Sequence, residues 1–302
     1  MALQTQAVAR PGTADLVPTI PRRNGWGGRL LVYGLIVFGA SLVLIPFAWM
    51  LSTSLTTTSR LFVYPPDLIP DPVAWDNYSK AWTSLPVSFT RFAFNTVFIT
   101  ILAMLAEIFS SSIVAYGFAR YKFPGRDFLF VVLLGSMMLP GVVLQVPSFL
   151  IWRQLNLLDT YDPLTVGAWF AWGPSYIFLL RQFFLTIPVD IDEAARLDGA
   201  NAFQIYYRIM LPLVKPALLA IGVLSFVGNW NNFSGALIYL NHLEKFPIVL
   251  ALKFFERNLS NNVPPFNFMM AMATLMTIPM ILLYFVAQRY FIEGITVGGV
   301  KG

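Results

Sequence analysis

Apolar residues gather in six long stretches along this chain, with shorter polar segments between them. Five stretches contain no charged residue and are long enough to cross about 30 Å of hydrocarbon as a helix. These five are 30–51, 128–152, 163–180, 216–240 and 266–287. A sixth stretch, 92–115, is similarly apolar but contains one acid, Glu107. The pattern therefore predicts an all-α membrane protein with six transmembrane helices.

The polar segment between the fourth and fifth stretches has a pattern of its own. Pro188 has a pre-set φ that suits the first turn of a helix, and Asp190 can cap that helix by accepting N–H groups. Asp192 and Glu193 favour the positive end of the helix dipole. We therefore expect a short helix that runs to about Leu197.

The same segment contains the signals for a reversal and a second short helix. Asp198 and Gly199 offer the positive φ that a tight turn needs. Asn201 can cap the second helix, and Pro212 can end it. Residues 185–215 are thus predicted to form a helix-turn-helix in water between two membrane spans.

Several residues of this segment stand at a fixed spacing. They are Glu193-Ala194-Ala195, then Gly199 after three residues, Ile209 after nine more, and Leu211-Pro212 after one more. At every one of these positions the pattern resembles the EAA loop of bacterial ABC-importer permeases. From about residue 30 to its end, the chain is similar to that family.

Two further stretches are similar to the maltose-type carbohydrate branch of the family. Residues 227–233 resemble its Trp-Asn segment in span five, and residues 288–302 resemble its C-terminal tail. The tail departs from the family pattern at Ile295 and Val297, which stand near places where Leu and Ala are common. Together, the two similar stretches point to a sugar as the cargo.

The resemblance implies a permease subunit that moves a sugar, an oligosaccharide or a disaccharide, across the bacterial plasma membrane by alternating access. Its implied partners are a homologous second permease, two cytoplasmic ATPase subunits, an extracytoplasmic solute-binding protein, the sugar and membrane lipid. ATP and Mg would be bound in the ATPase subunits, and this chain would bind no cofactor. The alternative cargo is glycerol-3-phosphate.

The resemblance also implies roles for individual residues. The helix around Glu193 to Leu197 would dock in a groove of the ATPase and transmit its closure on ATP binding. The residues expected to couple this chain to the ATPase are Glu193, Ala194, Ala195, Asp198, Gly199, Ile209, Leu211 and Pro212. In the C-terminal tail, Glu293, Gly294 and Lys301 would contact the ATPases.

Span five carries a polar cluster, Asn229-Trp230-Asn231-Asn232. Amides cannot be left without partners in hydrocarbon, so these side chains either bridge helices or line a hydrated path. The spacing places Asn229 and Asn232 on one helix face, whereas Asn231 points roughly 200° away from Asn229. Because amides beside a Trp also suit a sugar, the candidates for the substrate path are Asn229, Trp230, Asn232 and Gln145.

Spans three and four contain residues that are expected to break their helices at a similar depth. These residues are Pro140, Gln145 and Pro147 in span three and Gly173-Pro174 in span four. Broken helices are tolerated in membranes where they line cavities.

Glu107 lies in the middle of its span, where an ionisable group that faces lipid costs about 2.5 kcal/mol or more. It should therefore face protein or water. We interpret it as a hydrogen-bonded or protonated packing site beside Ser110, Ser111 and Ser112. A proton relay would need further ionisable partners within the spans, and the other five stretches contain none.

Composition narrows the class of protein. Of the 302 residues, 57% are hydrophobic and 12% are charged, against about 25% charged in soluble domains. Six spans leave no room for a separate catalytic domain, and a chain without cysteine and with one histidine has no disulfide, histidine triad or metal cluster. We expect no catalytic residue and no metal site. A stand-alone channel would explain the polar cluster but not the patterned segment.

The basic residues predict the orientation in the membrane. With six spans, 13 of the 20 Lys and Arg lie on the side of the N-terminus, which puts both termini and the helix-turn-helix in the cytoplasm. Because the bases are spread over separate loops, they do not indicate nucleic-acid binding. The domain prediction is a disordered cytoplasmic tail over 1–29, a six-span domain over 30–290 and a cytoplasmic tail over 291–302.

Two long connections fall on the opposite, outer side. The first, 52–91, contains Trp75 and Trp82, which suit an aromatic belt at the headgroups, a landing surface for an external protein, or both. The second, 241–265, is expected to face the same partner or to dip toward a pore.

Overall fold

The computed structural model describes residues 26–65, 68–257 and 266–298. Throughout these ranges the regular structure is helical and no strand occurs, which confirms the all-α prediction for the described part of the chain. The chain divides into two compact units, residues 1–48 and 49–302.

The first unit consists of most of helix α1 (Trp26–Ser54). Its described side chains are exposed through to Ala48, and from Leu30 to Ala48 they are uncharged and mostly apolar on all sides, as expected for a helix surrounded by lipid. The prediction of a disordered tail over 1–29 was wrong at its last four residues, because the helix that the apolar run nucleates extends back through Gly28 to Trp26. Residues 1–25 lie outside the described part.

Two other helices are long and unbroken. α3 (Phe89–Arg120) contains the predicted span 92–115, and α14 (Phe266–Gly298) contains the predicted span 266–287. α14 runs through Pro279 and continues past residue 291 to Gly298, and the predicted boundary between membrane domain and tail at 291 stays a prediction.

The third predicted span is two helices, α4 (Arg126–Ser136) and α5 (Gly141–Gln154), which are bent by 100°. The expected break at Pro140 is confirmed, since Pro140 takes the extended conformation directly before α5. The expected break at Pro147 was wrong, because α5 runs through this proline as membrane helices can. Gln145 also lies inside α5 and breaks nothing.

The fourth and fifth predicted spans are broken as well. α6 (Asp162–Trp169) and α7 (Pro174–Thr186) are separate, and Pro174 begins the second of them as predicted. α11 (Lys215–Trp230) and α12 (Phe233–Tyr239) are separated at the polar cluster. The Asn232 side chain caps α12 by accepting the N–H of Gly235 at 3.0 Å.

The breaks change how the spans can be counted. By length and composition, three described helices can each cross a membrane, and up to five spans result if each strongly bent pair is one span. The described part is all-helical and contains several apolar candidate spans, whereas the number of six spans stays a prediction.

Short elements fill the connection between α1 and α3. They are η1 (Thr58–Arg60) and α2 (Asp76–Thr83), and α2 packs against α14. The buried Asn77 amide ties this connection down by donating to the carbonyls of Ser54 and Thr56 at 2.8 and 2.9 Å.

The connection after α12 contains η3 (Leu243–Lys245) and α13 (Ile248–Arg257). Two buried side chains of α3 hold it in place. Asn95 donates to the carbonyl of Phe246 at 3.0 Å, and Thr96 accepts the N–H of Ile248 at 2.8 Å. Residues 258–265, the rest of the predicted outer connection, lie outside the described part.

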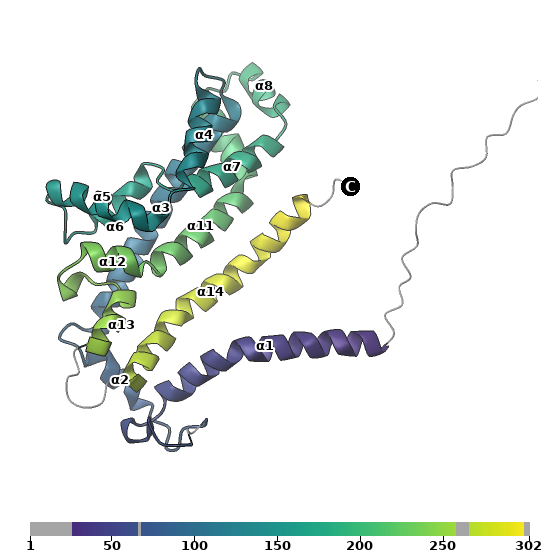
Figure 1. Cartoon of the computed structure of the whole chain (residues 1–302). Coiled ribbons are helices and arrows are strands. Elements are labelled where there is room, and N and C mark those ends of the chain that lie inside the picture. Colours follow the sequence, from purple (N-terminus) through teal and green to yellow (C-terminus); the bar gives the residue numbers. More distant parts are fainter. Residues whose placement is uncertain (1–25, 66–67, 258–265, 299–302) are drawn as a thin grey trace, which may run out of the picture. The chain divides into compact units, whose positions relative to one another are not determined.

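Within residues 49–302, α3 is the central helix. It packs against α6, α7 and α11, and α14 lies alongside α11 (Figure 1). One apolar cluster surrounds Phe92 on α3, and a second surrounds Tyr116 near the end of the same helix. α3 therefore links the cluster beside α2 and α13 with the cluster beside the predicted helix-turn-helix of residues 185–215.

Candidate functional site

The patterned segment forms the predicted helix-turn-helix. Its first helix, α8 (Asp190–Leu197), ends where expected, but its N-cap is Val189, so the prediction that Asp190 is the cap was wrong. The reason is that the N–H groups of Asp192 and Glu193 already donate to the carbonyl of Val189, which places Asp190 inside the first turn. There its charge still favours the helix dipole.

The turn and the second helix follow the local signals closely. Gly199 has φ +84°, and Asn201 forms a capping box with Gln204 at 2.9 and 2.8 Å, as predicted for the turn and the cap. The second helix comprises α9 (Ala202–Gln204), the π-helical η2 (Ile205–Met210) and α10 (Leu211–Leu213). Since it ends at Leu213, the prediction that Pro212 ends it was wrong by one residue.

A buried ion pair fixes α8 to the end of α3. The Arg120 Nε lies 3.1 Å from the Asp192 Oδ2, and the two side chains are only 4% and 5% exposed. Arg120 also donates from Nη2 to the carbonyl of Ile187 at 2.9 Å. The Nε hydrogen does not point at the carboxylate, and the Asp192 Oδ1 has no hydrogen-bond partner in the described structure. Attraction between the two opposite charges, more than directed hydrogen bonds, therefore holds this buried pair together.

Aromatic packing reinforces the same junction. The ring of Tyr206, in the second helix of the motif, lies 5.1 Å from that of Tyr116 on α3. The Tyr206 hydroxyl is hydrogen-bonded to Ser112 at 2.7 Å. The motif is thus attached to α3 at two points, by charge through Arg120 and by rings through Tyr116.

The residues expected to couple to an ATPase divide into two groups. An inward group packs against α3 and α7: Ala195 is buried, and Ile209 and Leu211 are half-buried. An outward group is exposed: Glu193, Ala194, Asp198, Gly199 and Pro212. The outward group is therefore the more accessible to another protein, and Ala195 is enclosed by its neighbours.

Three exposed apolar side chains lie on the same helix-turn-helix and were missed in the sequence. We call Leu197, Phe203 and Tyr207 the apolar patch; they are 89%, 71% and 62% exposed. The rings of Phe203 and Tyr207 are stacked with centroids 6.2 Å apart. The i, i+4 spacing of these aromatic residues is the signal that could have revealed the patch. Apolar groups as exposed as these suit a contact with another protein.

A second candidate site is a cavity of about 290 Å³ within the helices. It is lined by residues from α3, α5, α6, α11 and α12, together with the segment between α6 and α7. Gln145, Asn229 and Asn232 bring amides to it, and Trp152 and Trp172 bring aromatic rings. Three of the four substrate-path candidates therefore meet in one cavity, and the tryptophans are additions that the sequence did not reveal.

The residues of the polar cluster at the end of α11 differ in whether they line this cavity. Asn229 and Asn232 line it, whereas Asn231 is exposed elsewhere and donates to the carbonyl of Val227 at 2.9 Å. Trp230 is buried outside the lining, and its ring is stacked on that of Phe226 at 5.2 Å. Asn229 and Asn232 thus share the cavity, but the prediction that they share one helix face was wrong, because α11 ends at Trp230 and Asn232 precedes α12. The candidate Trp230 lies in the packing.

Glu107 on α3 lines the same cavity and joins α3 to α11. Its Oε2 accepts a hydrogen bond from the hydroxyl of Ser225 and a longer one, at 3.5 Å, from the Asn229 amide. Ser110, next along α3, instead donates to the carbonyl of Ala168 on α6 at 2.6 Å. Glu107 is thus hydrogen-bonded at a helix interface, as interpreted from the sequence, and it also faces the cavity.

Asp159 ties together two loops next to the cavity. Its N–H donates to the carbonyl of the lining residue Tyr239 at 2.8 Å, and its carboxylate accepts from Lys245 at 2.7 Å and from the N–H groups of Asn241 and His242. Burial raises the pKa of the Asp159 carboxyl, but the hydrogen bonds from Lys245, Asn241 and His242 outweigh it and hold the pKa well below its usual range. The single histidine is a loop residue, as expected.

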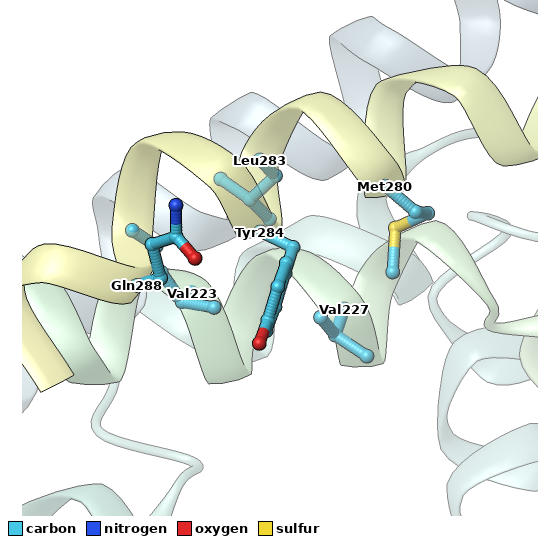
Figure 2. Close-up of a pocket in the computed structure, with 7 residues that line it drawn as sticks. Val223, Val227, Met280, Leu283, Tyr284 and Gln288 are labelled. Atoms are coloured by element: carbon cyan, nitrogen blue, oxygen red, sulfur yellow. The ribbon is translucent and has the colours of Figure 1, made fainter. Parts of the chain in front are cut away.

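An apolar groove of about 480 Å³ lies between α11 and α14. Figure 2 shows Tyr284 and Met280 extending from α14 toward α11, close to Val223 and Val227. Among its lining residues, the polar groups are the Tyr284 hydroxyl and the Gln288 amide. Although this groove is larger than the cavity beside Glu107, it offers a polar ligand few partners.

Glu293 and Gly294 fall within α14, but side chains beyond Gln288 are not described, and Lys301 lies outside the described residues. Within the described ranges, no three His, Cys, Asp or Glu residues gather in a way that could hold a metal ion.

The sequence and the fold are similar to those of known proteins. The family described as binding-protein-dependent transport system inner membrane component matches residues 107–297. The arabinooligosaccharides transport system permease protein AraQ of Halalkalibacterium halodurans is 33% identical over 90% of this chain and 96% of its own, and that of Bacillus subtilis is 35% identical over 86% and 92%. A solved bacterial ABC transporter involved in import of the acidic polysaccharide alginate has a TM-score of 0.77 at 27% identity, covering 88% of this chain and 98% of its own.

Proposed function

The chain belongs to the family of inner membrane components of binding-protein-dependent transport systems, and on this premise we propose that it is the permease subunit of an ATP-driven sugar importer. It moves an oligosaccharide or a disaccharide across the bacterial plasma membrane by alternating access. It is a transporter subunit and not an enzyme.

The cavity beside Glu107 is the observation that carries the choice of cargo. Its amides, Gln145, Asn229 and Asn232, can hydrogen-bond to sugar hydroxyls, and Trp152 and Trp172 offer apolar faces to the C–H side of a sugar ring. The names of the relatives and of the structural neighbour, which refer to arabinooligosaccharides and alginate, support a carbohydrate. Glycerol-3-phosphate is disfavoured, because no Lys or Arg is among the residues that line the cavity.

The helix-turn-helix is the part proposed to receive the ATPase. The exposed residues Glu193 and Ala194 and the apolar patch lie on this helix-turn-helix and are accessible to another protein. The cytoplasmic ATPase subunits, which hold ATP and Mg, dock on this surface. The remaining partners are a homologous permease and an extracytoplasmic solute-binding protein, in keeping with the family.

For the orientation, we propose six spans with both termini and α8 in the cytoplasm. Two observations support it. The basic residues favour this side by 13 to 7. In Figure 1, α8 lies at the opposite end of residues 49–302 from α2, as loops on opposite sides of a membrane require.

Labelling of single cysteines tests this orientation. Because the chain has no cysteine, Arg196→Cys on α8 and Trp75→Cys before α2 would each carry the only thiol of the chain, and both positions are exposed. An impermeant maleimide is expected to label Trp75→Cys in intact cells and Arg196→Cys only after permeabilisation. Labelling of Arg196→Cys in intact cells would reverse the topology.

Reconstitution tests the transport function itself. The complex is purified through a tag on this chain, placed in liposomes with the solute-binding protein, and given ATP and a panel of labelled sugars. We expect an ATPase to co-purify and at least one sugar to accumulate in an ATP-dependent way. A preparation with no associated ATPase, or no accumulation of any sugar, would contradict the proposal.

Gln145→Leu tests the role of the cavity. Leucine keeps the approximate volume but removes one hydrogen-bonding group, which is worth about 1 kcal/mol and so roughly a fivefold loss of uptake per assembled complex. Asn231→Leu is the matched control, since Asn231 is exposed outside the cavity. Equal uptake per complex in the two variants would remove the cavity from the sugar path.

A further inference from the structure

The cavity that we assign to the sugar has an unusual charge balance. Among the residues that line it, Glu107 is the only charged one, and no Lys, Arg or His accompanies it. The other polar groups of the lining are amides and hydroxyls, which carry no net charge. This chain's contribution to the path therefore has a negative or neutral character and no fixed positive charge.

The Glu107 carboxyl is held in position as a hydrogen-bond acceptor. Its Oε2 accepts from Ser225, whose side chain is fully buried, and from Asn229. The Asn229 amide in turn donates to the Ser225 carbonyl at 2.9 Å. Because these groups donate and are neutral, they suit a carboxylate without cancelling its charge. The nearest basic residue along α3 toward its C-terminal end, Arg120, is 13 residues away and is paired with Asp192.

A neutral and an acidic sugar meet this carboxyl differently. The hydroxyl of a neutral sugar can donate to it in a charge-assisted hydrogen bond. The carboxylate of a uronic acid brings a second negative charge into a cavity of about 290 Å³, with no cation in the lining to receive it. Like charges brought close together at a binding site are strongly unfavourable.

We propose that Glu107 makes this path selective for neutral sugars over sugars that carry a carboxylate. The inference rests on the proposed function, because it takes this cavity to be part of the sugar path. A similar fold serves the acidic polysaccharide alginate in another transporter, so the fold alone does not determine the charge of the cargo. The lining determines it, and Glu107 is its specificity-determining residue.

Protection of a cysteine in the cavity measures the selectivity directly. Leu144→Cys places one thiol in the lining of a chain that has none. In the purified complex, alkylation of this thiol is followed by mass spectrometry of this chain while sugar is added. The probes are two neutral trisaccharides, arabinotriose and maltotriose, and one acidic trisaccharide of similar size, trigalacturonate.

We expect a neutral probe to halve the alkylation rate at a concentration at least tenfold lower than trigalacturonate. Adding Glu107→Gln should reduce this difference to less than about threefold, mainly because trigalacturonate then protects better. Glutamine keeps the size of the side chain and an oxygen that accepts from Ser225, so the complex should assemble. The amount of assembled complex checks this.

Each other outcome overturns a definite statement. If trigalacturonate protects as well as the neutral probes, or if Glu107→Gln leaves the ratio unchanged, Glu107 does not select by charge, and the importer function is untouched. If none of the three sugars protects at tens of millimolar, the cavity is not a sugar site. The selectivity inference then fails together with that part of the proposed function.

Discussion

Replacing Asp192 with alanine is expected to uncouple transport from ATP hydrolysis, because it leaves the buried Arg120 without its counter-charge. Removing one partner of a buried ion pair costs about 3–5 kcal/mol. Here the cost falls on the junction between α8 and α3, since the two side chains are almost completely enclosed. α8 should therefore leave its position on α3 for part of the time, while the membrane helices remain assembled.

The measurements are sugar uptake per assembled complex, ATP hydrolysis, and hydrogen exchange of α8. We expect uptake to fall by more than tenfold, as a loss above about 1.4 kcal/mol implies, with ATP hydrolysis retained or falling less and exchange in α8 increased. Asp190→Ala is the matched control, because Asp190 lies in the same first turn but is exposed. It should lose only about 0.3–1 kcal/mol of interaction with the helix dipole.

A double substitution separates the charge effect from the packing effect. When both partners of a buried pair become apolar residues of similar size, stability is often unchanged or improved. Arg120→Met with Asp192→Leu should therefore recover most of the uptake that Asp192→Ala loses. If Asp192→Ala behaves like Asp190→Ala, the ion pair does not hold α8 in its functional position.

The second large effect is expected at the turn of the motif. Gly199 has φ +84°, a conformation that a β-branched residue adopts only under strain, at a cost of about 1–3 kcal/mol. A Cβ built at Gly199 would meet no atom within 4 Å, so the cost is in the backbone and not in a steric clash. Gly199→Val should therefore re-aim α8 without disturbing the membrane helices.

We expect Gly199→Val to reach the membrane at normal levels but to retain less ATPase on purification and to lose most of its transport. Gly199→Asn is the control, because asparagine tolerates the left-handed conformation and fills the same empty space. Normal ATPase association and transport in Gly199→Val would show that the geometry of this turn does not matter for coupling.

The local features of the helix-turn-helix could be predicted because each depends on residues close together in sequence. The positive φ at Gly199 and the capping box of Asn201 with Gln204 are decided within four residues. The break before Pro174 follows from the missing N–H of proline. Errors occurred at helix ends, at Asp190 and Pro212, where neighbouring backbone groups compete for the same hydrogen bonds.

The candidate site depended on contacts that no local pattern contains. Arg120 and Asp192 are far apart in sequence, and nothing in either segment indicates that they meet. Ala195 was predicted to couple to the ATPase together with Glu193 and Ala194. Its inward position is likewise decided by packing on α3 and α7. The tertiary structure is therefore needed to assign a role to each side chain of a motif, because residues from other segments decide which side chains are buried.

By itself, the sequence determined the helical class, the presence of apolar spans and the shape of the helix-turn-helix, since hydrophobic runs, prolines and caps act over short distances. Only the tertiary structure decided which side chains share the cavity. Glu107, Gln145 and Asn229 come from three different helices, and their meeting depends on the breaks in the spans and on the packing of α3. When the side chains of a site come from distant segments, tertiary packing decides which of them meet, and the periodicity of a single segment does not predict that packing.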